Sequence, residues 1–170
     1  MADRNVCPTD TITYNRCMER ERKFLVEQVP PKLSQYPHSD IRQGYITSGK
    51  DDATVRVRIK NGHYILTVKT GRGTARGEVE VNLNPSDGQR LWRLTARRRL
   101  EKTRYEIPLG QHTIELDIFK GRLKGLVFAE VEFSSNAALR RFKPPEWFGD
   151  DVSEREGYSN SELARYGKPK

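Results

Sequence analysis

The chain has 170 residues, a length that suits one domain with a single core. Charged residues make up 32% and the net charge is +8, which favours anionic partners without choosing between nucleic acid, a membrane surface and small phosphates. No apolar run approaches the roughly 20 residues that cross a bilayer, and no signal-peptide core is present, so we expect a cytoplasmic protein. The spacing of Cys7 and Cys17 suggests neither a disulfide framework nor a zinc site.

In chain order, residues 1–17 are polar and without periodicity, and we expect a flexible N-terminal extension before a domain over 18–170. Eight strand-like segments follow, separated by turn residues such as Asn61-Gly62, a good hairpin signal. They span about 18–27, 43–47, 54–60, 63–70, 76–84, 99–107, 112–119 and 127–134. Helices are expected after Pro85 with Ser86 or Asp87 as the cap, over about 136–142, and near 161–166.

Alternation gives each strand segment one apolar and one ionised face, because successive side chains point to opposite sides. In one segment, for example, Val57 and Ile59 oppose Arg56 and Arg58. An ordinary antiparallel sheet with one solvated face would give this pattern. Two features favour a charged interior instead: the ionised face is poor in Ser, Thr and Gln at its central positions, and the signs of the charges are sorted by strand.

The sorted charges predict an acidic site beside a basic site. The first segment carries Glu19, Glu21 and Lys23, the middle ones carry Arg56, Arg58, Lys69, Lys102 and Arg104, and the late ones carry Glu115, Asp117, Glu130 and Glu132. Carboxylates ~5 Å apart repel by ~3 kcal/mol per pair at an effective dielectric near 20, so such a cluster attracts a hard cation such as Mg²⁺ or Mn²⁺. Clustered Lys and Arg bind a compact polyanion. Metal beside phosphate suits phosphoryl chemistry, and a closed barrel would gather both around one ligand.

Short motifs occur in a fixed order along the chain. They are Glu19-x-Glu21-x-Lys23, Gln43-Gly44-Tyr45, Arg56-x-Arg58, Lys69 before a Gly-rich turn, Arg76-x-Glu78-x-Glu80, Glu101-Lys102-Thr103-Arg104-Tyr105, Glu115-x-Asp117-x-Phe119, Glu130-x-Glu132 and Trp147-Phe148-Gly149. Together they resemble the CYTH, or triphosphate tunnel metalloenzyme, family over about Met18 to Ala164. Arg20 departs from the pattern, since the family often has an apolar residue there, but by parity it faces away from the charged site.

The resemblance implies an α+β fold, mainly antiparallel β, in which an eight-stranded closed tunnel barrel has a polar, charged interior and helices packed outside. It implies that carboxylates hold Mg²⁺ or Mn²⁺, namely Glu19, Glu21, Glu80, Glu115, Asp117, Glu130 and Glu132. It implies that cations grip the triphosphate, namely Lys23, Arg56, Arg58, Lys69, Lys102 and Arg104. Lys23 and Tyr45 are the implied catalytic pair, which positions or activates the attacking water.

Within this family, the chain looks like the small bacterial inorganic triphosphatases, which cut tripolyphosphate to pyrophosphate and phosphate. Other triphosphate activities remain open: adenylyl cyclase, nucleoside or RNA triphosphatase, and thiamine triphosphatase. A non-enzymatic module that binds polyphosphate or nucleic acid would fit the positive charge but not the sorted carboxylates, and the ionised faces carry no regularly spaced aromatics for base stacking. We therefore expect a small-molecule triphosphate partner, without membrane or nucleic acid, and leave the oligomeric state open, a homodimer included.

Overall fold

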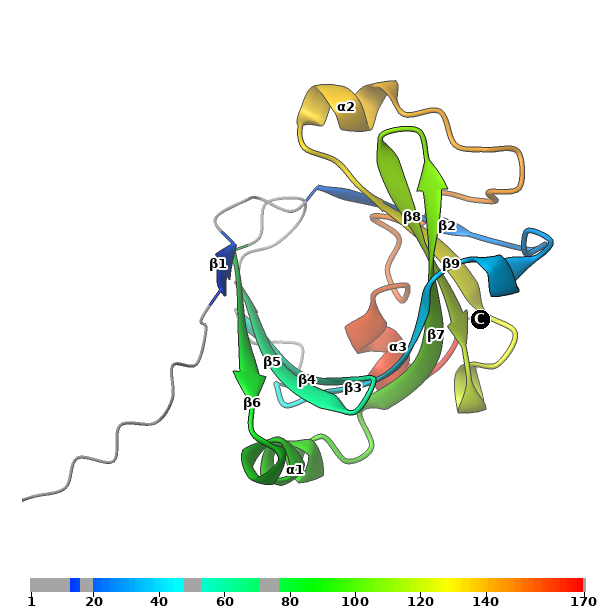
Figure 1. Cartoon of the computed structure of the whole chain (residues 1–170). Helices are drawn as coiled ribbons and strands as arrows, with labels where there is room; N and C mark the ends of the chain where they lie inside the picture. Colours follow the sequence, from blue (N-terminus) through cyan, green and yellow to red (C-terminus); the bar gives the residue numbers. More distant parts are fainter. Residues whose placement is uncertain (1–12, 16–19, 48–52, 71–76, 170) are drawn as a thin grey trace, which may run out of the picture.

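The computed structural model describes residues 13–15, 20–47, 53–70 and 77–169. In this part of the chain, nine strands form one sheet whose neighbouring strands are all antiparallel (Figure 1). They are β1 (Thr13–Asn15), β2 (Glu21–Leu25), β3 (His38–Tyr45), β4 (Ala53–Lys60), β5 (His63–Thr70), β6 (Gly77–Leu83), β7 (Arg99–Leu109), β8 (His112–Phe119) and β9 (Val127–Glu132). Their order is β1-β6-β5-β4-β3-β7-β8-β9-β2, and two short 3₁₀ turns, η1 (Leu33–Gln35) and η2 (Gly121–Leu123), interrupt the connections.

All eight expected strands are present in this antiparallel sheet. β3 starts at His38, five residues before the expected boundary, because β7 supplies backbone partners as far as Tyr105. The ninth strand, β1, pairs with β6 and lies within the segment expected to be an extension. Cys7 and Cys17 lie outside the described residues, and the division at residue 17 stays a prediction.

Three α-helices lie close to their expected positions: α1 (Pro85–Leu94), α2 (Asn136–Arg141) and α3 (Asn160–Tyr166). The expected cap of α1 is wrong by two or three residues. Asn84 caps the helix by accepting a hydrogen bond from the Asp87 backbone N–H, while Pro85 fills the first turn, where a missing N–H costs nothing. Ser159 and Glu162 form a capping box at α3. None of the helices in the described ranges is long and apolar enough to cross a membrane.

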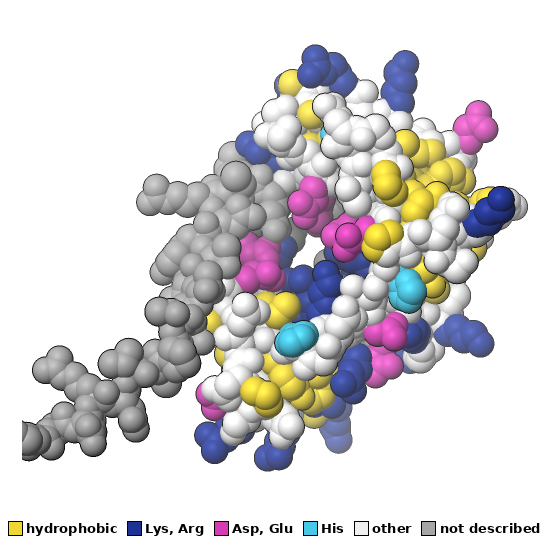
Figure 2. All heavy atoms as spheres, viewed as in Figure 1, with side chains coloured by type: hydrophobic (Ala, Val, Ile, Leu, Met, Phe, Trp, Pro, Cys, Tyr) yellow, Lys and Arg dark blue, Asp and Glu magenta, His cyan; other side chains and the backbone are white. Residues whose placement is uncertain are grey.

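The strand register puts the ionised residues on one face, because directly paired residues of neighbouring strands point to the same side. The pairs that connect this face are Lys23–Glu130, Glu130–Glu115, Asp117–Arg104, Tyr45–Arg56, Arg56–Thr67 and Thr67–Glu80. The sheet curves around a central space, so that this face is concave, and acidic and basic side chains surround a hollow there (Figures 1 and 2). Arg56, Lys102 and Glu130 are only 8%, 2% and 5% exposed, which excludes the open, solvated face.

The opposite, convex face carries the main apolar core. Leu116 and Val131 are fully buried there, and Phe142 and Phe148 from the segment after β9 pack over them with α2. Farther along the same convex face, α1 packs on β5, where Gly88 lies so close to the Tyr64 ring that a larger residue would clash. As parity predicts, Val57, Leu66 and Leu116 lie on this outer face.

The third helix, α3, is an exception to the expectation that helices pack outside. Its Leu163 and Ala164 are fully buried against Tyr45, Phe119 and Phe128, which lie on the same face of the sheet as the charges. In Figure 1, α3 lies within the curve of the sheet. The helix therefore covers one end of the charged face. The apolar cluster of Tyr45, Phe119 and Phe128 lies between α3 and the ionised residues.

A C-terminal strap, Gly149–Ser153, runs along the edge of β2 that does not face β9. Gly149 N–H donates to the Leu25 carbonyl (2.7 Å), Leu25 N–H donates to the carbonyl of Asp150 (2.9 Å), and Val152 N–H donates to the Lys23 carbonyl (2.8 Å). The Lys23 N–H donates to Ser153 Oγ (2.9 Å). The strap thus satisfies an edge that would otherwise be open for pairing, and it binds both the N–H and the carbonyl of Lys23.

Candidate functional site

Arg104 lies at the centre of the acidic half of the concave face. Its Nε donates to Asp117 Oδ1 (2.7 Å), and its Nη2 donates to Asp117 Oδ2 (2.6 Å) and Glu130 Oε2 (2.7 Å). Its Nη1 forms a further ion pair with Glu115. Burial disfavours the charged guanidinium, but Asp117, Glu130 and Glu115 outweigh that effect and raise the pKa of Arg104 well above its ordinary value.

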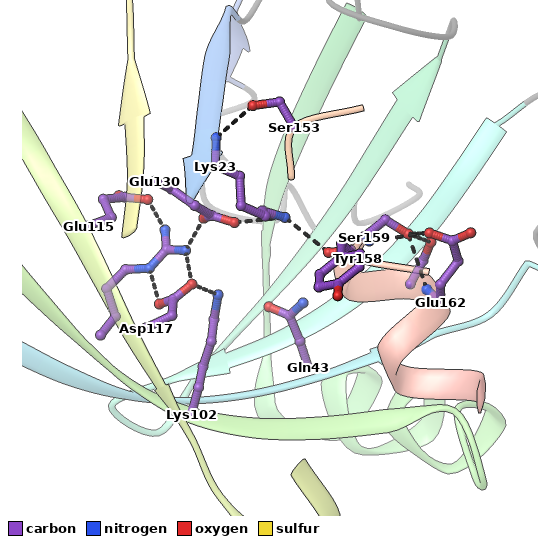
Figure 3. Close-up of polar contacts among 12 residues, drawn as sticks. Lys23, Gln43, Lys102, Glu115, Asp117, Glu130, Ser153, Tyr158, Ser159 and Glu162 are labelled. Carbon is purple, nitrogen blue, oxygen red and sulfur yellow. Dashed lines mark hydrogen bonds and ion pairs between the residues drawn. The ribbon is translucent and has the colours of Figure 1, made fainter. Parts of the chain in front are cut away.

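Two lysines flank this cluster (Figure 3). Lys23 Nζ lies 2.9 Å from Glu130 Oε1 and donates to the Tyr158 carbonyl at 3.4 Å, while Lys102 forms a fully buried pair with Asp117. Burial opposes the charge of Lys23, yet Glu130 and Glu21 raise its pKa. Burial and the repulsion of Arg104 lower the pKa of Lys102 to about 8. Lys23 is therefore a cation at neutral pH and cannot act there as a base.

Burial and neighbouring charges also act in opposite directions on the carboxylate of Glu130. Burial alone would raise its pKa, but Lys23, Arg104 and Lys102 hold that pKa well below the ordinary value. The carboxylate is consequently ionised and paired with two cations at neutral pH, instead of repelling its acidic neighbours without compensation.

The basic half of the face is formed by β4, β5 and β6. Arg56 Nη2 donates to Thr67 Oγ1 (3.1 Å) and lies 3.4 Å from Glu80, and Lys69 pairs with Glu78 at 2.7 Å. Burial and the charge of Arg56 lower the pKa of Arg58 to about 10. The Nε atoms of Arg56 and Arg58 are buried without a hydrogen-bond partner in the described part of the chain, so each retains a donor that an anion could satisfy.

Tyr45 lies on the charged face between the basic residues and α3. Its hydroxyl accepts a hydrogen bond from Gln43 Nε2 (2.7 Å), and both side chains are almost fully buried. Burial raises the pKa of Tyr45 despite the opposing charges of Arg56 and Lys23, so the phenol is neutral at physiological pH. Its partnership with Lys23 stays a prediction.

The predicted site residues are brought onto one face, but not as separate acidic and basic sites. Each half contains both signs, because neighbouring strands bring Glu78 and Glu80 next to Lys69 and Arg56. Glu21 and Glu132 are paired across β2 and β9 at the end of the acidic half, and Glu19 lies outside the described residues.

Several polar residues of this face were not among the predicted site residues. Gln43 and Thr67 are buried on it, and Ser153 and the Tyr158 carbonyl hold Lys23. Parity could have placed Gln43 and Thr67 on this face. No local signal marks the residues after Gly149, whose position depends on a long-range contact.

A model of the CYTH domain matches residues 18–164. The chain belongs to the CYTH domain family. It is 42% identical over 149 residues to an inorganic triphosphatase of Nitrosomonas europaea, covering 86% of this chain and 96% of that protein. It is 38% identical to an inorganic triphosphatase of Acetivibrio thermocellus, covering 86% and 93%.

Solved structures share the architecture of this CYTH domain. A crystal structure of an inorganic triphosphatase has a TM-score of 0.67 and 39% identity, covering 86% of this chain and 93% of that chain. A putative adenylyl cyclase from Hippeastrum, described as having a dominant triphosphatase activity, has a TM-score of 0.54 and 15% identity, covering 72% and 82%. The second likeness shows the fold alone.

Triphosphatases of the CYTH family are generally metal-dependent, and the donors of the acidic half fit a hard divalent cation. Oxygens of Glu115, Asp117 and Glu130 converge on the guanidinium of Arg104. The guanidinium occupies the position between the carboxylates that a metal cation would take. Among the described residues, no three acidic or imidazole side chains are already arranged as a metal site. The carboxylates therefore have the right chemistry but are held by an internal cation.

Proposed function

We propose that this CYTH protein hydrolyses inorganic triphosphate, cutting tripolyphosphate to pyrophosphate and phosphate. The observation that carries the proposal is the buried concave face, where Lys and Arg side chains from β4, β5 and β7 lie beside carboxylates from β8 and β9. A small, highly charged anion suits such a face, because each guanidinium can hold two phosphate oxygens. Relatives at about 40% identity that are inorganic triphosphatases support the same substrate.

The shape of the sheet supports a tunnel around the substrate. We propose that the curved sheet forms the eight-stranded tunnel of the family, with the strap along the free edge of β2 and α3 at one end. The phosphate chain would then lie among Arg56, Arg58 and Lys69 on one side and Lys102 and Arg104 on the other. The unpartnered Nε atoms of Arg56 and Arg58 would donate to phosphate oxygens.

The metal ligands belong to the same proposal. The carboxylates Glu115, Asp117 and Glu130 would hold Mg²⁺ or Mn²⁺, with Glu19, Glu21, Glu80 and Glu132 as further candidates. A bound divalent ion would neutralise charge on the phosphate oxygens and orient the triphosphate for in-line attack by water.

The remaining chemistry requires water to add to the terminal phosphorus while the bridging P–O bond breaks and pyrophosphate leaves with the electron pair of that bond. The proton of the water ends on a phosphate oxygen of the products or in solvent. Lys23, held as a cation between Glu130 and the Tyr158 carbonyl, would stabilise charge that develops on the phosphate oxygens. Tyr45 would help to orient the water as a neutral hydrogen-bonding group.

Phosphate release from a substrate panel tests the function. We expect tripolyphosphate to be cleaved faster than ATP, thiamine triphosphate or pyrophosphate, with Mg²⁺ or Mn²⁺ required and activity lost in a chelator. Arg56→Gln should reduce turnover, whereas Arg42→Gln, an exposed arginine on the convex face of β3, should not. Preferential cleavage of a nucleotide, cyclic AMP formation from ATP, or metal-independent binding without hydrolysis would each favour an alternative named above.

A further inference from the structure

Arg104 has almost no hydrogen-bonding capacity left in this structure. A guanidinium has five N–H groups, and four hydrogen bonds from Arg104 go to Glu115, Asp117 and Glu130. A side chain held this way cannot also grip a triphosphate. Its present partners and its proposed substrate contact are therefore alternatives.

The same argument applies to the carboxylates. Both oxygens of Asp117 accept from Arg104, and those of Glu130 are divided between Arg104 and Lys23. A divalent cation takes carboxylate oxygens as direct ligands. The positive charge of Arg104 on the same oxygens opposes its binding, so the cation binds more tightly where Arg104 has moved away.

We propose that Arg104 is an internal counter-ion that exchanges partners during ligand binding. In the metal-free protein it holds Glu115, Asp117 and Glu130 together. It yields these oxygens to the divalent cation and turns toward the phosphates, which stand nearer to Arg58. This exchange deepens the triphosphatase function and rests on it, because the second partner of Arg104 is the triphosphate.

Two observations favour movement of Arg104 over movement of the other cations on this face. Arg104 is the residue on which all three carboxylates converge, whereas Lys102 pairs with Asp117 and Lys23 with Glu130. Arg104 and Arg58 also lie on strands that flank the same neighbour, because β7 and β4 both pair with β3. Rotation of the long side chain of Arg104 across β3 would carry its charge from the acidic half toward the basic half.

The exchange makes metal and triphosphate binding mutually reinforcing. Metal that takes the carboxylates frees Arg104 for phosphate, and phosphate that attracts Arg104 frees the carboxylates for metal. By linkage, each ligand raises the affinity for the other by the same factor.

Calorimetric titration with Mn²⁺ tests the exchange without any turnover. Without triphosphate, Arg104→Gln should bind Mn²⁺ at least tenfold more tightly than wild type, because the competing cation is gone. A non-hydrolysable methylene analogue of tripolyphosphate should strengthen Mn²⁺ binding in wild type and have a much smaller effect in Arg104→Gln. Arg58→Gln, whose ion pair is with Glu80, serves as the matched control and should stay near wild type without the analogue.

Three results would overturn the exchange: unchanged Mn²⁺ affinity in Arg104→Gln, weaker affinity, or an equal gain in Lys102→Gln. The last result would mean that general loss of positive charge explains the effect. Tripolyphosphate hydrolysis by the wild-type protein is measured separately, so failure of the proposed function and failure of the exchange are distinguishable.

A second measurement needs only the wild-type protein and holds even if Arg104→Gln does not fold. The Nε–H signal of Arg104, assigned by NMR, should report its bond to Asp117 in the metal-free state. Saturating Mg²⁺ should shift that signal toward the position of a solvent-exposed arginine. A signal that stays unchanged while Mg²⁺ binds would show that Arg104 keeps its carboxylates, and the exchange would be wrong.

Discussion

Glu130→Gln should destabilise the metal-free protein, although repulsion among crowded carboxylates, taken alone, predicts the opposite. Glu130 is 5% exposed, and its oxygens lie 2.9 Å from Lys23 Nζ and 2.7 Å from Arg104 Nη2. Removing one partner of a buried ion pair costs about 3–5 kcal/mol, since the other charge stays buried without compensation. Because Arg104 keeps two carboxylate partners, we expect the free energy of unfolding to fall by about 3 kcal/mol. In a domain of this size, each kcal/mol lowers Tm by about 2–4 °C.

Thermal unfolding in a chelator at pH 7 measures this loss, which should appear as a fall in Tm of about 6–12 °C. Glu101→Gln, an exposed glutamate on the convex face of β7, is the control and should change Tm little. The pKa of Glu130 is lowered on folding, so its contribution is complete above the ordinary carboxyl pKa and is lost as pH falls through the lower folded value. The gap between variant and wild type should therefore narrow in acid. A Tm equal to or above that of wild type at pH 7 would refute this reasoning.

Three further changes probe the proposed chemistry and the strap. Lys23→Ala should lower kcat more than it raises KM, with a loss of roughly 2–4 kcal/mol of transition-state stabilisation, whereas Arg58→Ala should mainly raise KM. Steady-state kinetics on tripolyphosphate measure both effects. A near-normal kcat in Lys23→Ala would rule out the proposed partnership of Lys23 with Tyr45. Tyr45→Phe should leave the pH dependence of kcat below pH 9 unchanged, because burial keeps the phenol neutral; loss of an ionisation from that profile would show that Tyr45 acts as a base. Gly149→Ala should destabilise the fold by about 1–3 kcal/mol, because a Cβ there would lie 3.1 Å from the Leu25 carbonyl, and an unchanged urea midpoint would show that the strap tolerates the methyl group.

Alternation along the strands was enough to predict which side chains share the charged face. A period of two encodes the face directly, so Arg56, Lys102 and Glu130 could be assigned to it without knowing the strand order. The individual ion pairs could not be predicted this way. That Arg104 meets Glu130 depends on β7 and β9 both flanking β8, and strand order is a property of the whole chain.

Local signals also failed where tertiary contacts decide the outcome. α3 was expected near its observed position from its own residues, but its burial inside the curve of the sheet depends on the apolar ends of β3, β8 and β9. The cap at Asn84 was missed because three candidate capping residues occur close together, and only the backbone geometry selects one.

The strap along β2 affects the order in which the two halves of the concave face can fold during synthesis. Lys23 and Ser153 are 130 residues apart, and the other neighbour of β2 is β9, so both partners of this early strand are made late. The β3–β6 meander, by contrast, has short connections and can pair as it leaves the ribosome. Nascent chains arrested before Gly149 should therefore present a folded basic half while the Lys23 strand remains open to protease. Protection of that strand in such chains would show that β9 alone holds it.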